Sequence, residues 1–334
     1  MKTVILSVVL LIASLLCFAQ KTPKDYGYRH LQIMVKYDTV DVLIRSKKGE
    51  ESIKKPLLFF IQGSLAKPLI KYNDKSFFFP SPLENNVEEN YHMVIVNKPG
   101  LPLMVHEDSL SKSGQVLDKL TNKTPRAHTE KNYLEYYVAR NVIVLDSLLK
   151  KPWVDKSRVI VAGHSEGSTI AAYMASENKN ITHLIYSGGT PYYSRILSMV
   201  TQDRLKEKDS VNEWVEKDFS YWQDVVNDTT SVSRDHGWNS YKGTYSFSKN
   251  ENEVLKNLKI PVLITYGTKD EACPFNDMFR IEVIKEKIHH ITFKAYIGLE
   301  HNFFGLDSKG NIDPNKFNWD TVVKDWLDWI DMLP

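Results

Sequence analysis

One five-residue stretch, Gly163-His164-Ser165-Glu166-Gly167, places a hydroxyl nucleophile between two glycines at fixed spacing. It follows an apolar run at 159–162 that is typical of a buried strand, and it precedes a segment from Ser168 to about Asn178 that is typical of a helix. Side chains at the two glycine positions would clash in so tight a turn. The pattern predicts that the Ser165 hydroxyl stands above the carboxyl edge of a sheet, beside helix N–H groups that could stabilise an oxyanion.

The elements that must position this serine are indicated by the periodicity of apolar residues. Strands are expected at 30–37, 39–45, 57–61, 93–96, 159–162, 182–186, 260–266 and 291–297. Helices are expected at 132–149, 168–178, 277–287 and 319–333. An early antiparallel pair followed by alternating strands and helices predicts one α/β domain with a mostly parallel sheet. The active site of such a sheet lies at the carboxyl ends of its strands.

These features resemble those of the α/β-hydrolases across most of the chain after residue 19. That family orders its catalytic residues as Ser, then Asp or Glu, then His, with the acid after the next-to-last strand and the His after the last strand. The run Gly267-Thr268-Lys269-Asp270 is similar to the acid loop, and Gly298-Leu299-Glu300-His301 is similar to the histidine loop. The resemblance implies an α/β-hydrolase fold with flanking helices and an inserted helical cap.

The resemblance also implies a catalytic triad of Ser165, Asp270 and His301. A serine hydroxyl is a poor nucleophile unless a base accepts its proton during the attack. His301 would accept that proton and later deliver it to the leaving group. Asp270 would hold the imidazole in the productive tautomer and stabilise the imidazolium ion.

Three nearby residues are rivals for these roles. Glu271 is an alternative acid, because it directly follows Asp270. His289 and His290 are alternative bases, but they precede the last strand and should therefore lie at the wrong end of the sheet. The order of the three matched residues and their places at strand ends favour Ser165, Asp270 and His301.

An acyl-transfer site also needs donors for the negative charge that develops on the substrate oxygen. The resemblance implies that one donor is the backbone N–H of the residue after the nucleophile, here Glu166. The second would come from the loop after the third strand, where the family often carries His-Gly. This chain has Gln62-Gly63-Ser64 at that place, which indicates the Ser64 N–H as the second donor. Gln62 departs from the usual histidine.

Residues 1–19 are typical of a secretory signal peptide. Lys2 supplies the positive end, Val4–Phe18 is an almost unbroken apolar run, and Ala19 offers a cleavage point. The run is shorter than the roughly 18 to 20 apolar residues of a membrane span, and no later stretch is long and apolar enough to be one. We expect a secreted or periplasmic protein, with an uncleaved anchor or a lipoprotein at Cys17 as alternatives.

Composition excludes several classes of protein. The formal charge of +2 gives no footprint for nucleic acid. Cleavage near Ala19 would leave Cys273 as the only cysteine, so no internal disulfide is expected. The histidines are scattered without metal-ligand spacing, and no phosphate loop or dinucleotide fingerprint occurs, so we expect neither a metal nor a cofactor.

Two insertions, at 66–90 and about 190–250, are expected to shape the substrate site, and the second is the expected cap. It carries aromatic residues that could line an apolar pocket or simply pack the insertion together: Trp214, Phe219, Tyr221, Trp222, Trp238, Tyr241 and Tyr245. The first insertion contains an aromatic run at 77–79. The hydrolase domain is expected to span 20–334.

The function expected from these residues is hydrolysis of carboxylic esters through an acyl-enzyme intermediate. A serine peptidase or amidase with the same triad is the first alternative, and a non-catalytic binding protein of the same fold is the second. The substrate would be a small-molecule ester or a short peptide. An aminopeptidase needs a carboxylate for the substrate amine, for which the chain offers Glu107, Glu166 and Glu300.

Overall fold

The computed structural model describes residues 21–78, 83, 87–207, 213–233 and 239–333. The expected signal peptide lies outside these residues, as do Trp238 and Phe79. Among the described residues, the model contains no helix with the length and apolar character needed to span a bilayer.

An eight-stranded sheet runs through the centre of the domain. Its strands, in sheet order, are β1 (Tyr28–Val35), β2 (Asp38–Arg45), β6 (His92–Val96), β3 (Lys55–Ile61), β8 (Val154–His164), β9 (His183–Ser187), β10 (Val262–Gly267) and β11 (Ile291–Tyr296). β1 pairs antiparallel with β2, and β2 pairs antiparallel with β6. All other neighbours in this sheet are parallel. The predicted α/β architecture with a mostly parallel sheet is confirmed.

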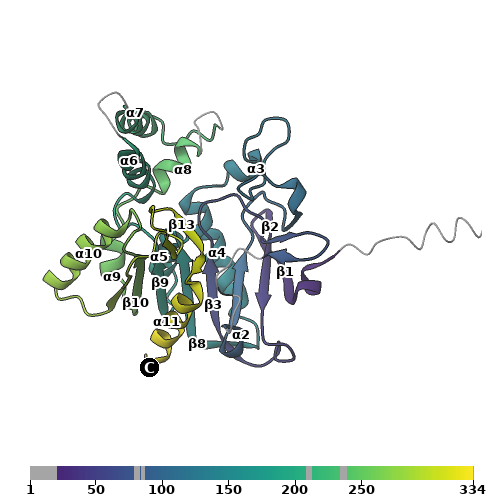
Figure 1. The fold of residues 1–334 in the computed structure, drawn as a ribbon. Coiled ribbons are helices and arrows are strands. Elements are labelled where there is room, and N and C mark those ends of the chain that lie inside the picture. Colours follow the sequence, from purple (N-terminus) through teal and green to yellow (C-terminus); the bar gives the residue numbers. More distant parts are fainter. Residues whose placement is uncertain (1–20, 79–82, 84–86, 208–212, 234–238, 334) are drawn as a thin grey trace, which may run out of the picture.

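Helices cover both faces of this sheet and make a three-layer domain (Figure 1). One core contains side chains from α4 (Leu134–Leu148), α5 (Glu166–Glu177), α9 (Asn252–Asn257) and α10 (Cys273–Lys285). The other contains side chains from α11 (Trp319–Asp331) and α2 (Val87–Asn90). Because both faces are covered, the central strands are apolar at nearly every position rather than alternately apolar and polar.

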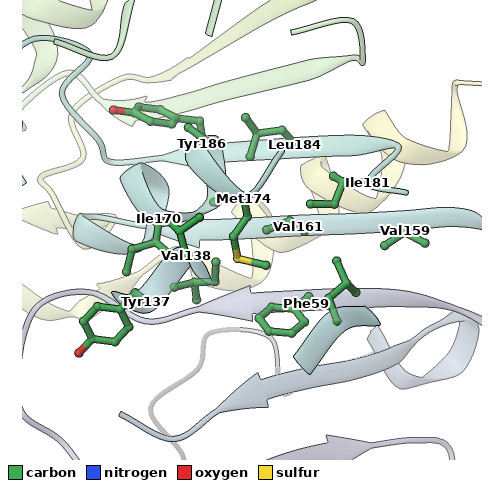
Figure 2. Close-up of a cluster of buried hydrophobic side chains, with 14 of the residues drawn as sticks. Phe59, Tyr137, Val138, Val159, Val161, Ile170, Met174, Ile181, Leu184 and Tyr186 are labelled. Atoms are coloured by element: carbon green, nitrogen blue, oxygen red, sulfur yellow. The ribbon is translucent and has the colours of Figure 1, made fainter. Parts of the chain in front are cut away.

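The strand that leads to Ser165 shows how one segment serves both cores. In β8, Val159 and Val161 pack with the core under α4 and α5, which Figure 2 shows in close-up. Ile160 and Ala162 point the other way, into the core under α11. All four side chains are fully buried. Because side chains on both faces of β8 are buried, the carboxyl end of this strand has a fixed position in the sheet.

The structure contains several short strands that the sequence does not predict. β4 (Ile70–Tyr72), β5 (Phe77–Phe78) and β7 (Met104–His106) form a small separate sheet, and β12 (Phe304–Leu306) and β13 (Ile312–Phe317) form another. Strands of two or three residues are too short to show a period, and β13 is mostly exposed and polar.

The predicted helices and strands differ from the observed ones mainly at their ends. α5 begins at Glu166 instead of Ser168, because the turn after Ser165 is already helical. α10 begins at Cys273, four residues earlier than expected, because Pro274 fits the first turn of a helix. The remaining short helices are η2 (Pro23–Tyr26), η3 (Glu107–Ser109) and α3 (Arg126–Thr129).

The segment between β9 and β10 holds α6 (Ser194–Lys206), α7 (Trp214–Asn227), α8 (Tyr241–Ser246) and then α9. Figure 1 shows α6, α7 and α8 gathered beyond one end of the sheet, at the top of the view. Trp222 stacks on Tyr245, and Tyr221 contacts Tyr241 edge to face, so these aromatic side chains join α7 to α8. This segment is the expected cap insertion; its role as a cover over the site stays a prediction.

One buried carboxylic residue, Glu251, links α5, β9 and the segment that follows β9. Glu251 is fully buried and accepts hydrogen bonds from Thr169 Oγ1 of α5 at 2.8 Å and from the Tyr186 hydroxyl of β9 at 3.1 Å. Its own N–H donates to the carbonyl of Pro191. Burial raises the pKa of Glu251 to about 8, against the two hydrogen bonds, which lower it.

We predict that Glu251 makes the fold less stable as pH rises. A Glu side chain in the unfolded chain has a pKa of about 4.3, so between that value and about 8 only the folded state keeps the proton. The stabilisation is complete below the lower value and is lost as pH rises through the upper one. The melting temperature of the wild type should therefore fall, relative to that of Glu251→Gln, as pH is raised from about 5 to 9.

The matched control is Glu253→Gln on α9, whose side chain is exposed. Its melting temperature should follow that of the wild type across the same range. If the curves of Glu251→Gln and wild type stay parallel, the carboxyl group at Glu251 does not keep its proton in the folded state.

Candidate active site

Ser165 lies at the junction of β8 and α5, in a backbone conformation that residues other than glycine rarely adopt. Its φ is 58° and its ψ is −129°. Its N–H donates to the carbonyl of Ser187 at the end of β9, at 2.8 Å, and its own carbonyl accepts from Ser168 N at 2.9 Å. These bonds to two neighbouring elements hold the strained turn in place.

The two glycines of the motif are required by backbone that passes very close. A Cβ atom at Gly163 would lie 2.0 Å from the carbonyl oxygen of Gly167. A Cβ atom at Gly167 would lie 2.2 Å from the carbonyl oxygen of Ile61, at the end of β3. No side chain fits at either position without moving backbone, which agrees with the tight turn expected from the sequence.

The side chains of Ser165, His301 and Asp270 form a continuous chain of hydrogen bonds. His301 Nε2 lies 3.0 Å from Ser165 Oγ, and His301 Nδ1 lies 2.8 Å from Asp270 Oδ2. Asp270 Oδ1 accepts from the N–H of Ala272 at 2.9 Å. The Asp270 side chain is fully buried, whereas that of His301 is 27% exposed. The histidine is thus held by the carboxylate on one side and open toward the serine on the other.

The loops that carry Asp270 and His301 are joined by hydrogen bonds. Lys269 N donates to the carbonyl of Leu299 at 2.8 Å, and Gly298 N donates to Thr268 Oγ1 at 2.9 Å. A Cβ atom at Gly267 would lie 2.2 Å from the same Leu299 carbonyl. The parallel pairing of β10 with β11 brings these two loops together at one edge of the sheet.

The alternative acid, Glu271, and the alternative bases, His289 and His290, lie elsewhere in the structure. Glu271 Oε1 accepts from Gln202 Nε2 of α6 at 2.8 Å instead of contacting the imidazole. The carbonyl of His290 accepts from Val262 N at the start of β10, so His289 and His290 lie at the opposite end of the sheet from His301.

Charges around His301 favour its protonated form. Burial lowers the pKa of His301, but the charge and hydrogen bond of Asp270 outweigh it, with smaller contributions from Glu271 and Glu300. The pKa of His301 is therefore held above its ordinary value. The pKa of Asp270 is lowered, because the attraction of His301 and the hydrogen bonds overcome the effect of burial. The pair favours a carboxylate beside an imidazolium ion.

A second histidine, which the sequence analysis does not single out, forms one wall of the site. The ring of His164 lies 5.0 Å from that of His301, between centroids, and its Nδ1 lies 3.1 Å from Ser187 Oγ. Burial and the charge of His301 lower the pKa of His164 to about 3, so it is neutral. It lies at the variable position of Gly-x-Ser-x-Gly, where the sequence pattern carries no information about the residue type.

Two backbone N–H groups flank Ser165 and are free of protein acceptors. A Cβ atom at Gly63 would lie 3.3 Å from Ser165 Cβ, so the loop after β3 passes directly beside the nucleophile. In the described part of the chain, neither the N–H of Ser64 nor that of Glu166 donates to a protein group. The structure thus places both expected donor residues next to Ser165.

A buried lysine holds the loop that carries Ser64. Lys98 follows β6 in the chain, and its Nζ donates to the carbonyl oxygen of Gly63 at 2.5 Å. Burial, with the nearby charges of Arg195 and Arg140, lowers the pKa of Lys98 to about 7. Because a peptide unit is planar, fixing the Gly63 carbonyl also fixes the direction of the Ser64 N–H. In the sequence, Lys98 is visible only as a polar residue at a strand end.

The three carboxylates considered for an aminopeptidase are engaged in other contacts. Glu166 is buried and forms an ion pair with Arg195 of α6. Glu300 Oε1 accepts from the N–H groups of Asn302 and Phe304. Glu107 accepts from Asn73 Nδ2.

Within the described residues, no three His, Cys, Asp or Glu side chains come together in a group that could hold a metal ion.

Comparisons with known proteins bear on the fold. Neither a family model nor a curated protein sequence matches the chain. Among solved structures, Est1E from Butyrivibrio proteoclasticus is 14% identical with a TM-score of 0.53, and the match covers 91% of this chain and 99% of that one. A protein described as a dipeptidyl aminopeptidase IV from Bacteroides ovatus is 11% identical with a TM-score of 0.58, over 94% of this chain and 37% of that one.

The acylaminoacyl peptidase of Pyrococcus horikoshii is 15% identical with a TM-score of 0.50, over 82% of this chain and 37% of that one. The chain thus spans little more than a third of the length of either peptidase. At these identities the similarity is one of fold. Together with the strand order and the helices on both faces of the sheet, it shows that this chain has the fold of the α/β-hydrolase superfamily.

Proposed function

We propose that the protein is a serine hydrolase that cleaves carboxylic esters through an acyl-enzyme intermediate, with Ser165, His301 and Asp270 as its triad. The observation that carries the proposal is the chain of hydrogen bonds from Asp270 through His301 to Ser165. A non-catalytic binding protein has no need for a nucleophile in strained backbone with a base at 3.0 Å.

The steps follow from this geometry. Ser165 Oγ attacks the ester carbonyl while His301 Nε2 takes the hydroxyl proton, and the carbonyl oxygen gains the negative charge. The tetrahedral intermediate collapses, the bond to the alcohol oxygen breaks, and His301 returns the proton to that oxygen. Water then attacks the acyl-enzyme by the same route and releases the acid and free Ser165.

The N–H groups of Ser64 and Glu166 are the proposed donors to the developing oxyanion. Each such donor contributes roughly 3 to 4 kcal/mol to the stabilisation of a transition state. Both are backbone groups beside Ser165, and both are free of other partners among the described residues. Gln62 in place of the family's histidine therefore does not remove a donor, and Lys98 supports the loop instead.

An ester substrate is favoured over a peptide that is recognised by its free amino terminus. An aminopeptidase must hold a charged substrate amine with a carboxylate, and Glu107, Glu166 and Glu300 are all engaged by protein partners. A peptidase that does not recognise an amino terminus remains the alternative. We also propose that residues 1–19 are a signal peptide, that 20–334 form the hydrolase domain, and that the protein acts outside the cytoplasm.

The first prediction tests the nucleophile and the bond. A fluorophosphonate probe should label the wild type and leave Ser165→Ala blank. The wild type should turn over short p-nitrophenyl esters and leave aminoacyl p-nitroanilides nearly untouched. Equal labelling of the two proteins would remove Ser165 from the mechanism, and faster cleavage of the anilides would replace the esterase by a peptidase.

The second prediction concerns pH. The neutral form of His301 is the base, so kcat/KM should rise with pH through the pKa of His301. Because Asp270 raises that pKa, the midpoint should lie above the ordinary value of about 6.5. Asp270→Asn should move the midpoint down and lower kcat by about 10⁴, since the imidazole loses its charge partner and its productive tautomer.

Glu271→Gln is the matched control for this prediction. It removes a neighbouring carboxylate that raises the pKa of His301 without bonding to the ring. We expect a small downward shift of the midpoint and little change in kcat. A greater loss of kcat in Glu271→Gln than in Asp270→Asn, with both proteins folded by circular dichroism, would make Glu271 the acid.

The third prediction concerns Lys98. Lys98→Met removes the donor that holds the Gly63 carbonyl, so the Ser64 N–H is no longer aimed. We expect kcat to fall by roughly 10- to 100-fold, less than for loss of a donor itself, with KM nearly unchanged. Lys71→Met, which removes a cation from the neighbouring strand β4, should keep kcat. An unchanged kcat in folded Lys98→Met would mean that the loop does not depend on this hydrogen bond.

A further inference from the structure

A polar cleft opens beside the loop that carries the proposed oxyanion donor. Its volume is about 40 Å³. Its lining comes from three parts of the chain: the loop after β3, the region of α3, and the insertion between β9 and β10. Its polar and charged lining residues include Ser64, His128, Asn132, Arg195 and Asn239. Figure 1 shows α3 and the helices of the insertion at the same end of the domain.

Two lining residues connect the cleft to the proposed oxyanion donors. Ser64 and Arg195 both line it, and Arg195 pairs with Glu166, the residue after the nucleophile. A substituent a few bonds from the scissile carbonyl would therefore enter this cleft when the carbonyl oxygen lies between the N–H groups of Ser64 and Glu166.

Within the described residues, the lining contains one permanently charged side chain and no carboxylate. That side chain is Arg195, whose guanidinium lies over the ring of Phe247, with 5.5 Å from its carbon to the ring centroid. Its backbone N–H donates to the Phe247 carbonyl. Glu166 occupies one nitrogen of the guanidinium, which has five N–H donors in all. Donors remain for a second anion.

The surroundings of the cleft carry an excess of positive charge. Lys98 and Arg140 are buried and donate only to neutral oxygens, those of Gly63, Asn97 and Asn141. In the part of the chain that the structure describes, neither forms an ion pair with a carboxylate. Burial, followed by the charges of Arg195 and Arg140, lowers the pKa of Lys98 to about 7, so Lys98 is fully charged only below that pH and Arg140 is the lasting cation of the two.

The nearby carboxylates do not cancel this excess. Glu166 pairs with Arg195, and Asp38, the carboxylate that acts on Arg140, is held by Lys131 and the Tyr136 hydroxyl. Buried charges without a counter-ion are costly, and an anionic ligand would offset that cost. Low-dielectric walls would also strengthen its attraction.

We propose that this cleft binds a carboxylate carried by the substrate on one side of its scissile ester, with Arg195 as the recognising side chain. The substrate class is thus an ester with an anionic acyl or alcohol part. The inference rests on the proposed ester hydrolysis at Ser165. Because the insertion supplies Arg195 while β8 and α5 supply Ser165 and Glu166, the insertion sets specificity and the sheet edge carries the chemistry.

Two matched pairs of esters test the proposal. Mono-p-nitrophenyl adipate against p-nitrophenyl hexanoate places the charge on the acyl side, and m-carboxyphenyl butanoate against m-carbamoylphenyl butanoate places it on the alcohol side. In one pair, kcat/KM of the wild type should favour the anionic ester by at least about tenfold, as expected for a charged hydrogen bond. Arg195→Gln should reduce that ratio to near one.

Two further variants separate recognition from folding. Glu166→Gln/Arg195→Gln leaves no unpaired buried charge and should lose the same preference. Arg204→Gln, which removes an exposed arginine of the same helix, should keep the preference. A preference that survives in the folded double variant, or that is lost in Arg204→Gln, would overturn the assignment to Arg195.

A binding measurement does not depend on turnover. Calorimetry with Ser165→Ala should detect adipate or m-hydroxybenzoate but not the corresponding amides, and the added Arg195→Gln change should abolish the signal. If neutral esters are hydrolysed and neither anion binds or is preferred, the proposed cleft is wrong while the hydrolase stands. If anions bind at Arg195 and no ester is cut, the hydrolase is wrong while the anion site stands.

Discussion

The candidate site depends on backbone packed against backbone around Ser165. The carbonyl oxygens of Gly167, Ile61 and Leu299 occupy the places where side chains at Gly163, Gly167 and Gly267 would begin. Such contacts leave almost no freedom for the turn, and they explain how a non-glycine residue stays at a φ of 58°. Packed carboxyl ends of parallel strands bring the serine, acid and histidine loops to one edge of the sheet.

Electrostatics divides this edge into two regions. Beside His301, the buried Asp270 favours positive charge on the imidazole, while the neutral ring of His164 fills space without competing for the proton. Beyond Ser64, cations outnumber carboxylates among the described residues. One region thus suits proton transfer, and the other suits recognition of negative charge. The loop after β3, held by Lys98, packs beside Ser165 and also lines the cleft.

The insertion between β9 and β10 connects these regions to the rest of the fold. Two aromatic pairs, Trp222 with Tyr245 and Tyr221 with Tyr241, join α7 to α8 and stabilise the insertion. The insertion also supplies Arg195, which pairs with Glu166 at the start of α5. A fold of this kind can change its substrate by exchanging residues of the insertion while the triad geometry is kept.

The sequence by itself determines the α/β class, the long strands and helices, and the places of Ser165, Asp270 and His301 at strand ends, because apolar periodicity and the glycine spacing are local. Only the tertiary structure decides that these three side chains are hydrogen-bonded, that Glu271 turns toward α6, and that short strands such as β13 exist. Only the tertiary structure pairs Glu166 with Arg195 and brings Lys98 Nζ to the Gly63 carbonyl. These contacts join residues 29 and 35 positions apart with no period or motif to link them, and they form only when the sheet brings separate loops together.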